Sequence, residues 1–169
     1  IRRFAESDLD FLVATSYSKS FNLYGERIGA LTVVTKNAAE AQVVLSQLKA
    51  VIRCIYSNPP AHGVRIVSHV LSDAARYAHW EAELAGMRNR IREMRGLLAE
   101  EMAKLGTKRD FSFVTRQAGM FSFTGLTPEQ VEKLATDYGV YAVKNGRICI
   151  CGLNHGNVAY VAKGISAVL

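Results

Sequence analysis

The sequence TSYSKSFNLYGERIGALTVV, Thr15–Val34, places a lysine among small hydroxylated residues on a segment that joins two apolar runs. The run before the lysine is DFLVA, Asp10–Ala14, and the run after it is IGALTVV, Ile28–Val34. Short apolar runs bounded by polar residues are typical of buried strands. We therefore predict two short buried strands, with Lys19 on the loop that joins them.

Downstream of these strands, apolar residues recur every three or four positions, as on one face of a helix. This spacing predicts helices over Asn37–Asn58, His62–Leu71 and Ala74–Leu105. Gly106 follows the longest of them as a C′ glycine would. Gly86 and Gly96 interrupt any coiled-coil seam in this helix, so we interpret it as a bridge between two domains.

The last third of the chain has a different pattern. Alternating apolar residues predict half-exposed strands over Phe111–Val114 and Gly119–Gly125. The segment Thr127–Gly139 begins with a capping box and a proline at the first helical position, which predicts a helix. An Asn-Gly turn predicts a hairpin over Val140–Cys151. The amphipathic segment Asn157–Leu169 predicts a last helix. Helices and strands that alternate in this way predict an α/β protein.

The composition limits the class of protein. With 169 residues, of which 49% are hydrophobic and 21% charged, the chain can form an ordinary globular core. It has no apolar run that could span a bilayer and no signal-peptide core, so we predict a soluble, cytoplasmic protein. Three cysteines without a C-x-x-C spacing and four histidines without H-E-x-x-H predict neither disulfides nor a metal site. Because the chain opens with Ile1, we expect a piece of a longer protein.

The net charge of +6 raises the possibility of a nucleic-acid partner. However, the densest group of arginines, in MRNRIREMRG, Met87–Gly96, alternates with apolar residues at helical spacing. This pattern favours a solvated helix face over a surface that follows phosphates. A basic nucleic-acid-binding module remains the less favoured alternative.

Lys19 has the surroundings that covalent chemistry would need. A lysine amine is a nucleophile only when it is unprotonated, which a neighbouring positive charge such as Arg27 favours. Arg27 could instead hold a phosphate with its planar fork, and Ser16 and Ser18 offer hydroxyl donors. A reactive lysine beside a phosphate cradle is what pyridoxal phosphate requires. The alternative is a solvated surface lysine.

Five segments in order resemble the fold-type I aminotransferases, specifically the aspartate and aromatic amino acid aminotransferases. They are SYSKSFNLYGERIGALTVV, LKAVIRCIYSNPPAHG, GMFSFTGLTPEQV, YGVYAV and NGRICICGLN, which run from Ser16 to Asn154. The resemblance covers essentially the whole chain. It also implies that these residues form only the C-terminal portion of the family's chain, which is more than twice as long.

The resemblance implies a role for each matching residue. Lys19 would be the catalytic lysine that bonds to pyridoxal 5′-phosphate, and Ser16 and Arg27 would bind the cofactor phosphate. Arg147 would bind the substrate α-carboxylate, although a strand arginine after a turn is usually a surface residue. Phe121 would line the substrate pocket, or else be an ordinary core aromatic.

Arg53 is the residue that bears on specificity. In the family this position reaches into the neighbouring subunit of a homodimer and pairs with the distal carboxylate of aspartate or glutamate. The alternative is a cation favoured by the C-terminal end of its helix. The aromatic enzymes of the family keep this arginine, so its presence leaves phenylalanine and tyrosine open as substrates.

The resemblance also implies a domain layout and a reaction. Residues 1–84 would be the C-terminal part of the large cofactor-binding domain, and residues 85–169 the small domain, of α+β type. The parent enzyme would transfer amino groups from aspartate or aromatic amino acids to 2-oxoglutarate. The group that pairs with the pyridinium nitrogen and the ring that stacks on the cofactor would lie upstream, so we expect the isolated chain to be inactive. The alternative is a non-catalytic fragment that serves folding or dimer contacts.

Overall fold

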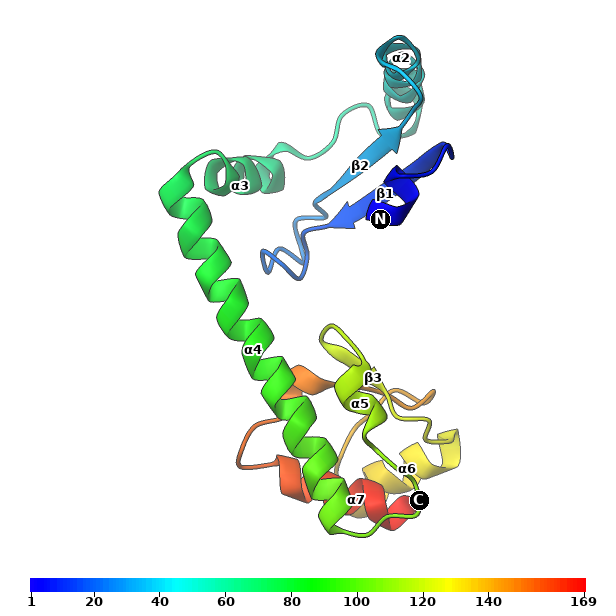
Figure 1. Cartoon of the computed structure of the whole chain (residues 1–169), viewed down its shortest axis with the longest axis vertical. Coiled ribbons are helices and arrows are strands. Elements are labelled where there is room, and N and C mark those ends of the chain that lie inside the picture. The colour runs from blue at the N-terminus through cyan, green and yellow to red at the C-terminus, as the bar shows by residue number, and fades with distance from the viewer. The chain divides into compact units, whose positions relative to one another are not determined.

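An antiparallel pair of strands, β1 (Phe11–Ser16) and β2 (Gly29–Val34), organises the first part of the chain (Figure 1). The structure is a computed structural model that describes all residues, 1–169. The ladder runs from the pair Phe11 and Val34 to the pair Ser16 and Gly29. Both predicted strands are therefore confirmed in position, and Lys19 lies on the loop between them.

The prediction that these strands are buried is wrong. Leu12 of β1 is 66% exposed and Leu31 of β2 is 55% exposed. The sheet has only two strands, so no further strand pairs with either of them. Apolar side chains on such a pair stay in contact with water wherever no helix covers them.

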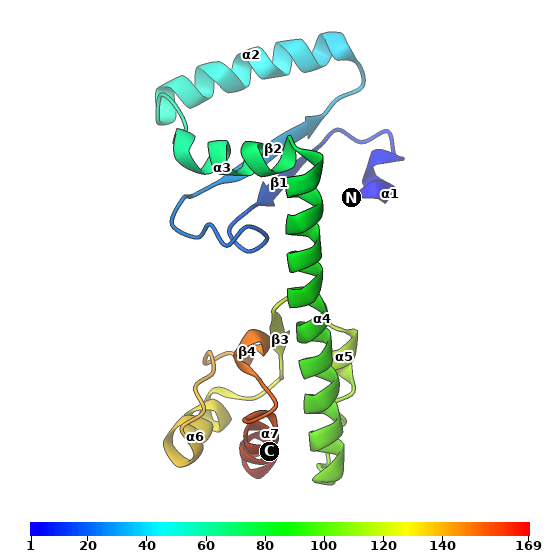
Figure 2. The ribbon, with the colours of Figure 1, turned by 90° about the vertical axis from the view of Figure 1, so that its left-hand side faces the viewer.

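Three helices accompany this strand pair. They are the short α1 (Arg2–Ala5), α2 (Ala38–Ile55) and α3 (Ala61–Leu71). Asn37 starts α2, because its side chain accepts a hydrogen bond from the backbone N–H of Glu40 at 2.9 Å. Helix α2 lies beside β2 (Figure 2), and residues of the two elements line a shallow groove of about 200 Å³.

The long predicted helix is confirmed as α4 (Ala74–Lys104). It ends before Gly106, whose φ of +63° is a left-handed conformation that favours glycine. Its buried apolar residues are Met94, Leu98 and Met102, whereas Met87 of the same predicted stripe is 56% exposed. The apolar stripe is therefore fully buried only in the C-terminal half of the helix, whereas Trp80 and Leu84 in the N-terminal half are half-buried.

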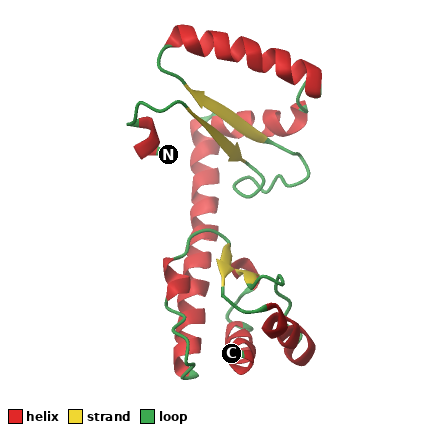
Figure 3. Ribbon diagram, turned by 90° about the vertical axis from the view of Figure 1, so that its right-hand side faces the viewer, coloured by secondary structure: helices red, strands yellow, loops and turns green.

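The chain divides into two compact units, Ile1–Glu81 and Ala82–Leu169. The second unit contains short strands and helices (Figure 3). Its buried apolar residues form one hydrophobic core. After α4 its elements are α5 (Phe113–Arg116), β3 (Phe121–Phe123), α6 (Pro128–Tyr138), β4 (Arg147–Cys149), a 3-10 turn (Ile150–Gly152) and α7 (Val158–Val168). This mixture of helices and strands confirms the α/β class. The identification of the two units with residues 1–84 and 85–169 of a large and a small domain stays a prediction.

Local sequence signals describe α6 well. The side chain of Thr127 accepts from the backbone N–H of Gln130, and the Gln130 side chain accepts from the backbone N–H of Thr127 at 2.9 Å. Gly139 ends the helix with a φ of +61°. The capping box and the glycine stop that the sequence predicts are both confirmed.

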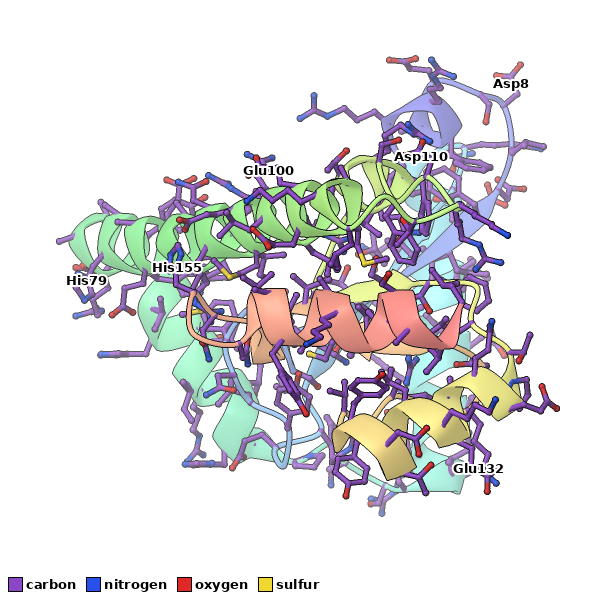
Figure 4. The ribbon with its side chains drawn as sticks, turned by 90° about the horizontal axis from the view of Figure 1, so that it is seen from below. Asp8, His79, Glu100, Asp110, Glu132 and His155 are labelled. Carbon is purple, nitrogen blue, oxygen red and sulfur yellow. The ribbon has the colours of Figure 1, made fainter.

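The predicted strand over Phe111–Val114 is wrong, because this segment begins α5. Asp110, labelled in Figure 4 on the loop after α4, accepts hydrogen bonds from the N–H of Ser112 at 2.7 Å and from its hydroxyl at 2.5 Å. Phe111 and Val114 are both buried at helical spacing. Phe111 and Val114 therefore point to the core from one helical turn instead of alternating along a strand. The hydrogen bonds from Ser112 hold the pKa of the Asp110 carboxyl below its usual value.

The predicted hairpin over Val140–Cys151 is also wrong in its pairing. The turn exists, with the N–H of Gly146 donating to the Val143 carbonyl at 2.8 Å. However, β4 pairs with β3, and Val140–Val143 forms no strand. Thr124 favours the pairing of β4 with β3, because its N–H and its hydroxyl both donate to the Gly146 carbonyl, at 3.0 Å and 2.7 Å.

Gly146 should be far less tolerant of a side chain than Gly106. Both have positive φ, but a Cβ on Gly146 would lie 2.7 Å from the Leu126 carbonyl oxygen, whereas a Cβ on Gly106 would meet nothing within 4 Å. We expect Gly146→Ala to lower the free energy of unfolding by about 2–4 kcal/mol and Gly106→Ala by about 1 kcal/mol. Urea unfolding of both variants measures the difference, and equal losses would contradict the close approach at Gly146.

Candidate active site

The loop between β1 and β2 carries the lysine and arginine that the sequence singled out. The N–H of Tyr17 donates to the Ile28 carbonyl at 3.1 Å, which closes the loop at the end of the ladder. The exposed ammonium of Lys19 lies 5.3 Å from the centre of the Tyr24 ring, a cation–π distance. Arg27 donates to the Tyr24 carbonyl at 3.0 Å. Both cationic side chains therefore gather around Tyr24.

The backbone around Arg27 is held in an unusual conformation. Arg27 has a φ of +51°, in the left-handed region that non-glycine residues seldom adopt. Two residues later, a Cβ on Gly29 would lie 2.6 Å from the Thr15 carbonyl oxygen, so only glycine allows the strands to approach here. Strained backbone of this kind clusters at functional sites, which supports a binding role for Arg27.

Hydroxyl groups complete the polar side of this loop. The Ser16 hydroxyl accepts from the N–H of Ser18 at 3.3 Å, and Ser18 is only 7% exposed. The ladder pairs Ser16 with Gly29, which brings Ser16 to the end of the sheet where Arg27 lies. The carboxylate of Glu26, next to Arg27, pairs with His62 at 2.7 Å. The loop thus offers an ammonium, a guanidinium and a hydroxyl, the donor set that fits a phosphorylated carbonyl compound.

Arg53 lies in the last turn of α2, where a cation is favoured by the helix dipole. Its guanidinium is exposed and donates to the Ser57 hydroxyl at 2.5 Å. Ser57 has a φ of +67° and, like Asn22 and Arg27, is a non-glycine residue in the left-handed region. The helix-end interpretation and a substrate role both agree with this position.

Arg147 and Phe121 lie together in the second unit. They come from the two paired strands β4 and β3, and the Arg147 guanidinium carbon lies 4.8 Å from the centre of the Phe121 ring. The Arg147 N–H donates to the Asn145 side chain at 3.1 Å, so the turn residue holds the start of β4. Phe121 is 40% exposed and does not belong to the hydrophobic core.

The prediction that the arginines of Met87–Gly96 form a solvated face is wrong for Arg95, which is 3% exposed. Arg90 is exposed as predicted, although it donates to the Leu153 carbonyl at 2.6 Å. Arg109, beyond α4, donates to the carbonyls of Thr124 and Gly125 at 3.3 Å and 3.1 Å. Part of the positive charge of the chain is therefore used to bind backbone carbonyls.

Sequence reasoning missed Arg95. Burial lowers the pKa of its guanidinium, yet arginine remains charged at neutral pH. The burial of Arg95 could have been predicted from its position in the apolar stripe of α4. It follows Met94 directly and lies four residues after Ile91 and three before Leu98. A charged residue on a core-facing stripe needs hydrogen-bond partners.

No group of three or more histidine, cysteine or acidic side chains is arranged so that it could hold a metal ion. None of the helices combines the length and the apolar character needed to cross a membrane.

Comparison with known proteins identifies the class to which this fold and lysine loop belong. The family model described as aminotransferase class I and II matches residues 1–165. The chain belongs to this family.

Its similarity to individual members is close over its whole length. It is 55% identical to an aspartate aminotransferase of Pseudomonas aeruginosa, over 100% of this chain and 42% of that protein. It is 46% identical to an aromatic-amino-acid aminotransferase of Escherichia coli, over 100% of this chain and 43% of that protein. The chain thus spans less than half the length of the curated relatives it matches.

A solved structure agrees with this fold. The aromatic-amino-acid aminotransferase of Burkholderia pseudomallei, described as covalently bound to pyridoxal phosphate, matches with a TM-score of 0.94 and 52% identity. The match covers 99% of this chain and 42% of that one.

Proposed function

We propose that this chain is part of a pyridoxal-phosphate-dependent aminotransferase that acts on aspartate, aromatic amino acids or both, with 2-oxoglutarate as the amino-group acceptor. The observation that carries the proposal is the β1–β2 loop, which begins directly after Ser16 and holds Lys19 and Arg27 against Tyr24. Relatives named as aspartate and aromatic-amino-acid aminotransferases support both substrate classes.

Each residue of this loop has a distinct task in the proposal. Lys19 would hold the cofactor covalently through its amine, and the same amine, once released from the cofactor, would move a proton at the substrate Cα. Arg27 holds the phosphate as a bidentate pair, and the Ser16 hydroxyl donates to it. Pyridoxal phosphate, when bound, supplies an electron sink for the bonds broken at that carbon.

Arg147, Phe121 and Arg53 are assigned to the substrate. Arg147 takes the α-carboxylate, and the Phe121 ring, 4.8 Å from its guanidinium carbon, gives the pocket an apolar wall. Arg53 reaches the distal carboxylate of a dicarboxylic substrate in the neighbouring subunit of a homodimer. The first unit belongs to the cofactor-binding domain and the second to the small domain. The cytoplasmic location stays a prediction.

A direct test compares a complete aminotransferase chain that contains this sequence with the 169 residues alone. The complete homodimer should transfer the amino group of aspartate or phenylalanine to 2-oxoglutarate. The shorter chain should have no measurable activity and should bind pyridoxal phosphate weakly, because the groups that would stack on the cofactor ring and pair with its pyridinium nitrogen belong to the rest of the complete chain. Its exposed apolar side chains, such as Leu12, should also favour association or partial unfolding. An inactive complete chain would contradict the proposed function, and turnover by the shorter chain would contradict this account of the site.

A further inference from the structure

Arg95 is a buried guanidinium that binds main-chain carbonyls instead of a carboxylate. One of its terminal nitrogens, Nη1, donates to the Val114 carbonyl at 2.8 Å and to the Ser122 hydroxyl at 3.1 Å. The other, Nη2, donates to the carbonyls of Gly119 and Phe121 at 2.8 Å and 2.6 Å. The single side chain therefore ties α4 to α5, to the loop before β3 and to the first residue of β3.

The pleat of β3 links this network to the opposite face of the strand. Ser122 is 1% exposed and points to Arg95, whereas its neighbours Phe121 and Phe123 are 40% and 56% exposed. Successive side chains of a strand point to opposite faces. Anchoring Ser122 inward therefore directs Phe121 outward.

Arg147 meets Phe121 on that outward face. The ladder pairs Phe123 with Arg147 and Phe121 with Cys149, so Arg147 is a diagonal neighbour of Phe121. The Arg147 side chain is exposed and its guanidinium carbon lies 4.8 Å from the ring centre. A shift or rotation of β3 would move the ring from beneath the guanidinium.

We propose that Arg95 is a positioning residue for the substrate site: it fixes β3, and through Phe121 it fixes the Arg147 guanidinium that binds the substrate α-carboxylate. This inference rests on the proposed function of Arg147. The four hydrogen bonds need a planar fork with two nitrogens, each of which donates twice, and the single ammonium of a lysine cannot reproduce them.

The test is a double-mutant cycle of Arg95→Met and Arg147→Ala in the complete enzyme, with KM and kcat measured for aspartate and phenylalanine. Arg95→Met alone should raise KM for both substrates by about tenfold or more, because displaced groups bind a substrate poorly. In the Arg147→Ala background the same change should have almost no further effect on KM, since the group it positions is already gone.

Three further variants keep the test decisive. Arg92→Met, an exposed arginine on the same helix, should leave KM and kcat unchanged. If Arg95→Met does not fold, Arg95→Lys and Ser122→Ala remove only part of the network and should show smaller KM increases with the same dependence on Arg147.

Each outcome decides a different statement. The positioning role would be overturned if the increases in KM from Arg95→Met and Arg147→Ala were fully independent, so that their free-energy effects add in the double variant. It would also be overturned if Arg95→Met lowered thermal stability and left KM unchanged. If Arg147→Ala itself leaves KM unchanged for both substrates, the proposed function of Arg147 fails, whatever Arg95 does.

Discussion

Replacing Lys19 with alanine should reduce transamination by the complete enzyme by about 10⁴-fold or more, because the same amine attaches the cofactor and moves the proton. The fold should remain intact, since Lys19 is exposed and its ammonium lies over the Tyr24 ring at the surface. Turnover of aspartate with 2-oxoglutarate measures the loss, and circular dichroism monitors the fold.

Lys49→Ala is a matched control for this result. Lys49 is an exposed lysine of α2 in the same unit, and the proposal gives it no role. Its variant should keep ordinary activity. Comparable activity of the Lys19 and Lys49 variants would show that the loop lysine is a solvated surface residue.

Arg147→Ala and Arg53→Ala should lower kcat/KM for different sets of substrates. Arg147 is proposed to bind the carboxylate that every amino acid has, so its loss should lower kcat/KM by about 30-fold or more for both aspartate and phenylalanine. Arg53 is proposed to bind only the second carboxylate, so its loss should lower kcat/KM to that extent for aspartate and hardly at all for phenylalanine. Equal losses for the two substrates in the Arg53 variant would remove its assigned role.

The same variants can test whether Arg53 acts across a dimer interface. A hybrid dimer of one Lys19→Ala subunit and one Arg53→Ala subunit would have one site with both residues intact. Mixing the two variants under conditions that allow subunit exchange should therefore restore part of the aspartate activity. No restoration in verified hybrids would place Arg53 in its own subunit's site.

Local sequence signals predicted those elements that local interactions determine. Helix α6 begins at the capping box of Thr127 and Gln130 and ends at Gly139, so residues within the segment itself determine both of its ends. The apolar spacing of Ala74–Leu105 predicted α4, because its core-facing residues recur at helical intervals. The lysine loop was equally predictable, since two apolar runs enclose it.

Elements that depend on distant partners could not be predicted in this way. Val140–Val143 has the apolar residues of a strand, but Thr124 binds the Gly146 carbonyl and β4 pairs with β3. The same pairing brings Arg147 beside Phe121, a contact that no local pattern indicates. The arginine on the apolar stripe of α4 looked solvated because its four acceptors lie elsewhere in the sequence.

The burial of β1 and β2 was predicted from their apolar residues, and the structure leaves side chains such as Leu31 exposed. An apolar run indicates that a strand would be more stable if buried, but it does not show whether another element covers the strand. Within this chain α2 covers β2 only in part.

The central claim is that Lys19 is the residue to which the cofactor attaches. It is tested most directly by incubating the complete enzyme with pyridoxal phosphate, reducing it with borohydride and mapping the modified peptide by mass spectrometry. The account predicts one modified lysine, Lys19, and no fixed cofactor in the Lys19→Ala variant. Attachment at another lysine, or equal attachment in the variant, would contradict it.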